Sequence, residues 1–313
     1  MGKSKRPKPI PVKDPQRARQ VRRAIMHTLG AVVFVGLLGV GFYHLRSYVE
    51  REVVFPQRPP KVVLKNRPAW MSDALAIQII NTVKPAGTHS AFDRQLLQDT
   101  AMILRNNPWI RQVKQVRRAY GQRPGDTLEI DCEYRAPIAL VHWKDYYWLV
   151  DGEAVKLPEQ YTAQQLPGIV VGPNRRLNIR VIEGVSHPPV ESGQVWPGED
   201  LAAGLDLVKL LYGQVYADEI VKVDVTNFAG RIDPKEAQIT LVTKYDTQIR
   251  WGRPINAKDF FVEVSTPQKL AYLRDVWTQF HRVDGGMPWI DIRFDRIIYP
   301  ADGARTASAG GTR

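Results

Sequence analysis

The longest apolar run in the chain lies close to its N-terminus. Residues 24–45 contain no Lys, Arg, Asp or Glu, and their two histidines, His27 and His44, stand near the ends of the run. A helix of this length spans about 33 Å, which matches the hydrocarbon thickness of a bilayer. A cleavable signal peptide would have a shorter apolar part followed by a small-residue cleavage site, and neither feature is present. The pattern therefore predicts one uncleaved transmembrane helix, followed by a proline-rich linker at residues 46–60 that is extended over residues 53–60.

The residues after the linker carry the spacing of one strand and two helices. Residues 61–66 alternate as a short strand, and apolar positions three and four apart predict helices over residues 72–83 and 92–106. Ser72 or Asp73 is the expected N-cap of the first helix. The side chains expected to face inward are Leu75, Ile79, Ile80 and Val83 in the first helix, and Phe92, Leu96, Leu97, Ile103 and Leu104 in the second.

A basic strand and an acidic strand follow. Residues 109–120 are expected to be extended, residues 121–126 to turn, and residues 128–134 to return as a strand. The first strand carries Arg111, Lys114, Arg117 and Arg118, and the outward side of the second carries Glu129, Asp131 and Glu133. Cations beside Trp109 are also what a nucleic-acid groove needs, but the acids opposite would repel phosphate. We therefore favour cross-strand ion pairs and expect no nucleic-acid partner.

Cys132 is the only cysteine of the chain, so an intrachain disulfide and a thiolate metal cluster are excluded. It shares one side of the predicted strand with Leu128, Ile130 and Tyr134. We interpret Cys132 as a small core residue.

The second half of the chain predicts a larger mixed domain, residues 136–300, with an antiparallel sheet and two helices. The expected strands are residues 140–143, 147–151, 154–157, 219–227, 236–244, 247–253 and a closing strand at 289–299; the expected helices are residues 199–214 and, opened by Thr266, 267–280. Leu201, Leu205, Val208 and Leu211 are spaced for the buried face of the first of these helices. Residues 301–313 are small and polar, which predicts a disordered tail. The fold class is α+β.

The net charge of +12 is concentrated at the N-terminus. Residues 1–23 contain nine Lys or Arg and one acid, Asp14, which gives +8 and leaves +4 for the other 290 residues. Only Arg46 and Arg51 stand shortly after the apolar run. This asymmetry predicts a cytoplasmic basic tail and a body on the outer side of the membrane.

We find no motif for catalysis or metal binding. The four histidines of the body, His89, His142, His187 and His281, stand in separate segments without metal-ligand spacing, and no nucleophile-elbow, S-x-x-K or phosphate-loop motif is present. Two carboxylate pairs, Asp151 with Glu153 and Asp291 with Asp295, stand at strand or turn positions where acids usually face solvent. We predict no enzymatic activity, no metal, no cofactor and no small-molecule substrate.

One aromatic cluster keeps a second interpretation open. Trp143, Tyr146, Tyr147 and Trp148 lie in the hairpin predicted at residues 140–151. Such rings can stack on a sugar or a peptide, although packing of the hairpin is the interpretation that we favour.

The order strand, helix, helix, strand, strand over residues 61–135, behind a membrane anchor, resembles a POTRA module. The segments 107–110 (NPWI), 127–130 (TLEI) and 135–139 (RAPIA) are similar to the version found in the FtsQ/DivIB family of bacterial cell-division proteins. The segments at 149–158, 166–172, 251–252, 269–270 and 290–295 continue the resemblance, which covers residues 24–298. The chain departs from the family pattern in the long stretch 173–198 and in having Phe294 where a Tyr is common.

This resemblance implies a partner-binding role. In the family, the corresponding region binds the small single-pass division proteins FtsB and FtsL, which implies that role for Arg293, Phe294, Asp295 and Arg296. Because the closing strand comes last in the sequence, we expect it at a sheet edge, where a strand offers backbone groups that a partner segment can pair with. For Ile290 and Ile292 we predict a role in closing the core instead.

The prediction from sequence is a non-enzymatic scaffold of the division septum, anchored in the inner membrane with its body in the periplasm. It would link FtsB/FtsL-like partners to septal peptidoglycan synthases. Two alternatives stay open: a POTRA-containing envelope transport or assembly factor, and a membrane-anchored cell-wall enzyme.

Overall fold

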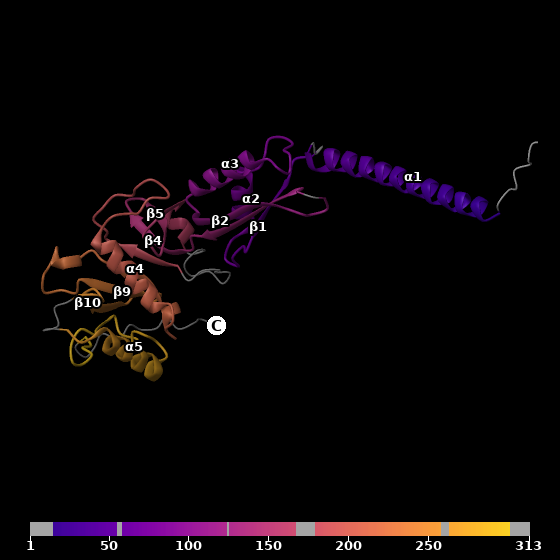
Figure 1. Cartoon of the computed structure of the whole chain (residues 1–313). Coiled ribbons are helices and arrows are strands. Elements are labelled where there is room, and N and C mark those ends of the chain that lie inside the picture. The colour runs from indigo at the N-terminus through magenta and orange to yellow at the C-terminus, as the bar shows by residue number, and fades with distance from the viewer. Residues whose placement is uncertain (1–14, 55–57, 124, 167–178, 258–262, 301–313) are drawn as a thin grey trace, which may run out of the picture. The chain divides into compact units, whose positions relative to one another are not determined.

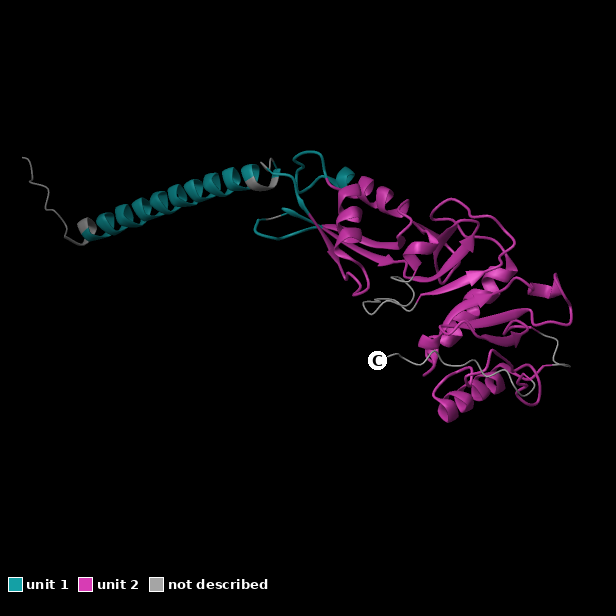
Figure 2. Ribbon diagram, turned by 180° about the vertical axis from the view of Figure 1, so that it is seen from behind, with its two compact units in different colours: residues 1–61, 85–96, 118–128 teal, residues 62–84, 97–117, 129–313 magenta. Residues whose placement is uncertain are grey.

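The computed structural model describes residues 15–54, 58–123, 125–166, 179–257 and 263–300. These form two compact units, shown in Figure 2: residues 1–61, 85–96 and 118–128 make up unit 1, and residues 62–84, 97–117 and 129–313 make up unit 2. Most of the core lies in unit 2.

Unit 1 begins with the long helix α1, Pro15–Val49, followed by a short π-helix, Glu50–Val54 (Figure 1). The part of α1 from Arg19 to Val49 is long and apolar enough to cross a membrane, and its most apolar stretch is not buried by the rest of the protein. The predicted extended linker is wrong at its beginning, because the π-helix includes Val53 and Val54. Linker residues 55–57 lie outside the described residues.

The next five elements appear in the predicted order. They are β1 (Lys61–Lys65), α2 (Asp73–Thr82), α3 (Arg94–Arg105), β2 (Ile110–Ala119) and β3 (Thr127–Tyr134). The strands form a three-stranded sheet in the order β1-β3-β2. Cys132 is 4% exposed, as expected of a core residue, and burial raises the pKa of its thiol to about 11.

Local caps define the two helices. Ser72 Oγ accepts a hydrogen bond from the Leu75 N–H at 3.2 Å, and Asp93 Oδ1 accepts one from the Leu96 N–H at 3.2 Å. Because Asp93 is the cap, α3 begins at Arg94 and Phe92 precedes it.

The inward faces are predicted correctly except at two positions. Leu75, Ile79, Val83, Leu96 and Leu104 are buried, and Ile80 and Leu97 are half-buried. Phe92 is 71% exposed because it precedes the helix, and Ile103 is 44% exposed because it lines an open cleft beside Pro108.

Cross-strand ion pairs hold two cations of the basic strand, as predicted. Arg117 pairs with Glu129 at 2.8 Å and Arg111 with Glu133 at 2.9 Å. Arg118 instead donates to the backbone carbonyl of His89 at 2.7 Å.

The remainder of unit 2 is built on an eight-stranded sheet in the order β11-β10-β9-β8-β7-β4-β5-β6. The strands are β4 (Pro137–Trp143), β5 (Tyr146–Asp151), β6 (Lys156–Tyr161), β7 (Arg180–Glu183), β8 (Ile220–Asp224), β9 (Ile239–Thr243), β10 (Gln248–Gly252) and β11 (Trp289–Asp291). The purely antiparallel sheet that we predict is wrong, because β4 with β7, β7 with β8, and β10 with β11 are parallel. Helix α4 connects β7 to β8 and α5 connects β10 to β11, which is the kind of crossover that parallel neighbours need.

Strand β7 belongs to the long stretch 173–198 in which no strand is predicted. The stretch 166–172 and the first part of 173–198 fall largely outside the described residues. Part of this apparent insertion is therefore an interior strand of the sheet.

Two helices pack against the eight-stranded sheet (Figure 1). They are α4 (Glu199–Leu211) and α5 (Thr266–Phe280), and Ser265 rather than Thr266 is the N-cap of α5. The four predicted inward residues of α4 are all 1% exposed or less. Short 3-10 helices lie at Ala163–Gln165, Ala217–Glu219 and Phe228–Gly230. Trp196 and Trp251 are among the largest fully buried side chains.

Candidate partner-binding edge

The closing strand lies at an edge of the eight-stranded sheet, as the sequence predicts. Strand β11 pairs with β10 on one side only, with Ile249 opposite Ile290 and Arg250 opposite Asp291. It is shorter than the predicted strand at 289–299 and ends at Asp291. Ile290 and Ile292 are fully buried, which confirms that these two side chains close the core.

The outer side of β11 is covered by the chain itself at one position. The Asp291 N–H donates to the Ile298 carbonyl and the Ile298 N–H donates to the Asp291 carbonyl, both at 2.9 Å. In an antiparallel pair that exchanges both hydrogen bonds, the flanking residues direct their backbone groups the other way. The outermost backbone at this edge therefore belongs to Ile297 and Tyr299, and the Tyr299 side chain is 37% exposed.

Arg293 shapes the turn between these two paired positions. Its guanidinium binds the Asp291 carboxylate through Nε to Oδ1 at 3.0 Å and Nη2 to Oδ2 at 2.7 Å. Nη1 donates to the Lys235 carbonyl at 3.1 Å, and the residue is only 8% exposed. The hydrogen bonds to Asp291 raise the pKa of Arg293 in spite of burial. The structure thus gives Arg293 a role in forming the edge.

The other three predicted partner-binding residues are more accessible. Phe294 is half-buried with the Arg293 guanidinium 5.1 Å from its ring, and Asp295 and Arg296 are exposed. The Tyr272 hydroxyl of α5 donates to the Asp295 carbonyl at 2.6 Å. The turn is therefore fixed to α5 through its backbone, while the side chains of Asp295 and Arg296 face solvent.

A buried ion pair lies next to the turn that Arg293 shapes. Lys269 Nζ lies 2.6 Å from Glu263 Oε2, and Glu263 Oε2 also accepts the Arg253 N–H at 2.9 Å. Burial lowers the pKa of Lys269, although the nearby Glu263 carboxylate opposes this. The adjacent Val264 N–H donates to the Arg293 carbonyl at 2.8 Å, so this pair and the turn are part of one arrangement.

Sequence reasoning identified the edge but missed Tyr299, Ile297 and Glu263. The first two lie within the predicted strand 289–299, where nothing in the alternation marks the turn at 293–297. Glu263 is too far from Arg253 in sequence for a local pattern to reveal the contact.

The carboxylate pairs considered for acid/base chemistry are engaged elsewhere. Asp151 is 4% exposed, accepts the Glu153 and Val155 N–H groups at 2.8 Å, and pairs with Arg135 at 2.6 Å. Glu153 pairs with Arg135 and Arg111, and hydrogen bonds from Arg135 help to lower its pKa. Asp291 is held by Arg293 and Asp295 is exposed. Neither pair forms the isolated, apolar carboxylate site that would raise a pKa for proton transfer.

Other candidate chemistry is equally sparse in the part of the chain that the structure describes. Within it, no group of three or more His, Cys, Asp or Glu side chains is placed to hold a metal ion. Of the aromatic hairpin, Trp143 and Trp148 pack against the core, His142 stacks on Tyr147 with ring centroids 4.4 Å apart, and Tyr146 is 42% exposed. This favours the packing interpretation for most of the cluster.

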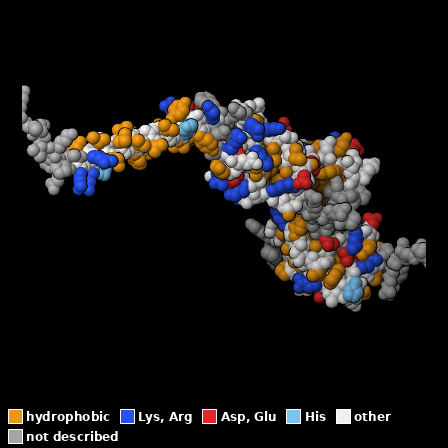
Figure 3. Space-filling view, turned by 90° about the vertical axis from the view of Figure 1, so that its right-hand side faces the viewer, with side chains coloured by type: hydrophobic (Ala, Val, Ile, Leu, Met, Phe, Trp, Pro, Cys, Tyr) orange, Lys and Arg blue, Asp and Glu red, His pale blue; other side chains and the backbone are white. Residues whose placement is uncertain are grey.

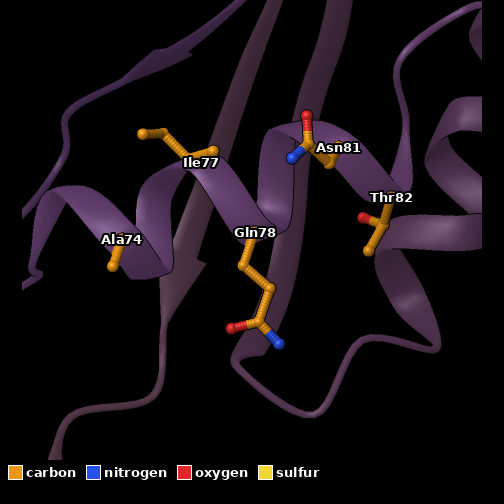
Figure 4. Close-up of a pocket in the computed structure, with 5 residues that line it drawn as sticks. All are labelled: Ala74, Ile77, Gln78, Asn81 and Thr82. Carbon is orange, nitrogen blue, oxygen red and sulfur yellow. The ribbon is translucent and has the colours of Figure 1, made fainter.

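A shallow depression lies along the exposed side of α2 (Figure 4). Its five lining residues are Ala74, Ile77, Gln78, Asn81 and Thr82, none of which is charged. The Thr82 hydroxyl donates to the Ile79 carbonyl at 2.7 Å, as a helix-internal bond. This surface lacks the converging polar groups that a catalytic site needs.

No protein-family model matches the chain, and no curated protein matches it.

Proposed function

We propose that this protein is a non-enzymatic, single-pass scaffold of the bacterial division machinery. Its body would bind FtsB/FtsL-like single-pass proteins in the periplasm and connect them to septal peptidoglycan synthases. The proposal is supported by the FtsQ/DivIB-like segments at residues 107–110, 127–130 and 135–139, by the helix long enough to span a membrane, and by the sheet edge at residues 289–299.

The edge is the observation that carries the proposal. Ile297 and Tyr299 direct backbone N–H and C=O groups away from β11, and the exposed Asp295 and Arg296 stand just before them. An extended partner segment could therefore continue the sheet beyond residues 297–299 and contact these side chains. The backbone would supply affinity, and the side chains would select the partner.

The charge distribution supports the orientation in the inner membrane. Nine cations precede the apolar run, which favours a cytoplasmic N-terminus and a periplasmic body. The scaffold would thus join the cytoplasmic side of the septum to periplasmic synthesis through protein contacts alone.

Recovery of partners from membranes tests this proposal. Full-length tagged protein would be purified from detergent-solubilised membranes and its companions identified by mass spectrometry. We expect small single-pass coiled-coil proteins and septal synthases. Recovery of outer-membrane or secretion components in their place would discard the division role in favour of an envelope assembly factor, and release of fragments from purified peptidoglycan would indicate an enzyme.

A pair of substitutions at one position separates backbone from side-chain recognition. Tyr299→Pro removes the outward N–H, whereas Tyr299→Ala removes only the side chain. We expect Tyr299→Pro to reduce partner recovery much more than Tyr299→Ala. Equal recovery with both variants would contradict strand addition at this edge.

A further inference from the structure

Helix α1 is longer than its apolar run. The helix starts at Pro15, whereas the run without charged side chains starts at residue 24. At about 1.5 Å per residue, the helical segment 15–23 extends about 13 Å beyond the apolar run. When the apolar run fills the hydrocarbon layer, this basic segment lies at the level of the lipid headgroups.

Three arginines of this segment share one helix face. Arg19, Arg22 and Arg23 are spaced i, i+3 and i+4, which places them side by side. Val21 and Ile25, four residues apart, lie on a different face and are 57% and 60% exposed. Figure 3 shows cationic side chains gathered at the N-terminal end of α1 and apolar side chains along the rest of it. We call Arg19, Arg22 and Arg23 the basic face.

The two ends of α1 differ in how their cations are balanced. At the C-terminal end, Arg46 Nε lies 2.9 Å from Glu50 Oε1. At the N-terminal end, the only acid among residues 1–49 is Asp14, against nine Lys or Arg in residues 1–23. No acidic residue of helix α1 neutralises the positive charge of the basic face. This charge therefore attracts anions from outside the chain.

We propose that the basic face binds the anionic phospholipids of the membrane surface. Guanidinium groups pair with phosphates through two parallel hydrogen bonds, and their long side chains can reach from a membrane-spanning helix to the headgroup layer. Each cation directly beside a membrane helix raises the affinity for an anionic lipid surface roughly fivefold. The proposal requires the membrane anchor but does not depend on the division partners.

Lipid retention measures this interaction on the full-length protein. The chain would be reconstituted in vesicles of phosphatidylcholine containing about one third phosphatidylglycerol and extracted with mild detergent; the lipids that stay bound would then be counted by mass spectrometry. We expect the ratio of phosphatidylglycerol to phosphatidylcholine among the bound lipids to be about fivefold or more above the ratio in the vesicle, and this enrichment to weaken as salt is raised. Arg19→Gln, Arg22→Gln and Arg23→Gln together should lower the enrichment at least about threefold.

A matched variant separates a local site from overall charge. Lys84→Gln, Arg94→Gln and Arg105→Gln remove three exposed cations from the body and should leave the enrichment unchanged. A wild-type protein whose bound lipids match the vesicle composition would overturn the proposal, and so would equal losses in both triple variants. Binding of a labelled duplex DNA that depends on the basic face, without enrichment of phosphatidylglycerol, would also overturn it and assign the face to nucleic acid.

Discussion

A buried cation stands at each edge of the eight-stranded sheet, Lys156 at β6 and Arg293 at β11, and the two are stabilised in different ways. At the β6 edge, Lys156 is 6% exposed, and its ammonium contacts Ser192 Oγ at 3.1 Å and the Trp148 ring at 4.3 Å. Burial lowers the pKa of Lys156. At the β11 edge, Arg293 is similarly buried, but its bonds to Asp291 raise its pKa. The Asp291 carboxylate favours the charged form of Arg293. Lys156 has no carboxylate among its described contacts, so its burial disfavours the charged form and destabilises the fold.

The backbone differs between the edges as well. Along β6, Lys156 exchanges hydrogen bonds with Gly193 and Gln194 at 2.7 and 2.9 Å, and Pro158 has no N–H to offer. At the β11 edge, the self-pairing through Ile298 leaves the backbone of Tyr299 directed outward. Proline in an edge strand is a common protection against strand addition, so Pro158 favours β11 over β6 as the edge that accepts a partner.

Removing the paired cation should have the largest effect. We expect Arg293→Ala to lower the free energy of unfolding by about 3–5 kcal/mol, because it leaves the Asp291 carboxylate buried without its bidentate partner. Denaturant unfolding of the full-length protein in detergent would measure this. The exposed Arg296→Ala is the control and should change stability by less than about 0.5 kcal/mol. Equal stability of the two variants would mean that Arg293 does not form the edge.

The next largest effect concerns the loop that leads into β11. Burial pushes the pKa of Asp284 up, but hydrogen bonds from Arg282, Thr247 and the Gly286 N–H outweigh this and hold the pKa below its ordinary value. Asp284→Asn should therefore cost about 1.5–3 kcal/mol at neutral pH.

The same shift makes the contribution of Asp284 depend on pH. Because the folded-state pKa is lowered, the stabilisation is complete above the unfolded-state pKa of about 4 and is lost as pH falls below it. Unfolding curves of wild type and Asp284→Asn should converge in acid. A constant difference between them at all pH values would contradict this assignment.

A smaller effect is expected for partner binding through side chains. Phe294→Ala combined with Arg296→Glu should weaken partner affinity about tenfold, which corresponds to about 1.4 kcal/mol. Affinity would be measured by titration of purified partner. Gln160→Ala on the β6 edge is the matched control and should bind normally; a loss there of the same size would remove the distinction between the edges.

The smallest expected effect is a gain in stability from a substitution at the β6 edge. Lys156→Met replaces a buried cation by an apolar side chain of similar length, and we expect it to raise the free energy of unfolding by about 1 kcal/mol at pH 7. Because the folded-state pKa of Lys156 is lowered, wild type gains stability as pH rises toward the unfolded-state pKa of about 10.4. The advantage of Lys156→Met should shrink over that alkaline range. A destabilised variant would show that the Trp148 and Ser192 contacts compensate fully for burial.

Local sequence patterns predicted the helices and most strands well, but they did not predict which strands pair with each other. The spacing in α4 identified four of its five buried leucines and valines, because one face of that helix meets the sheet, and missed only Leu207. Strand β7 was missed because its four residues lie inside the stretch 173–198, which was interpreted as a departure from the family pattern, and without it the parallel neighbours of the sheet could not be foreseen.

The candidate edge shows the same limit. Alternation in residues 289–299 predicted an edge strand, but not that Arg293 turns inward. That position depends on Asp291 two residues earlier and on the Lys235 carbonyl 58 residues away. The outward backbone of Tyr299 likewise follows from a self-pairing that only the fold reveals.

Hydrogen exchange at the β11 edge tests the central claim most directly. Full-length protein would be exchanged in deuterated buffer with and without its purified partner, and the peptide that contains residues 297–299 would be followed by mass spectrometry. Strand addition predicts that the amide of Tyr299 exchanges at least about tenfold more slowly in the complex, with no change along β6. A stable complex in which residues 297–299 exchange at the free rate would contradict the claim that the partner binds this edge.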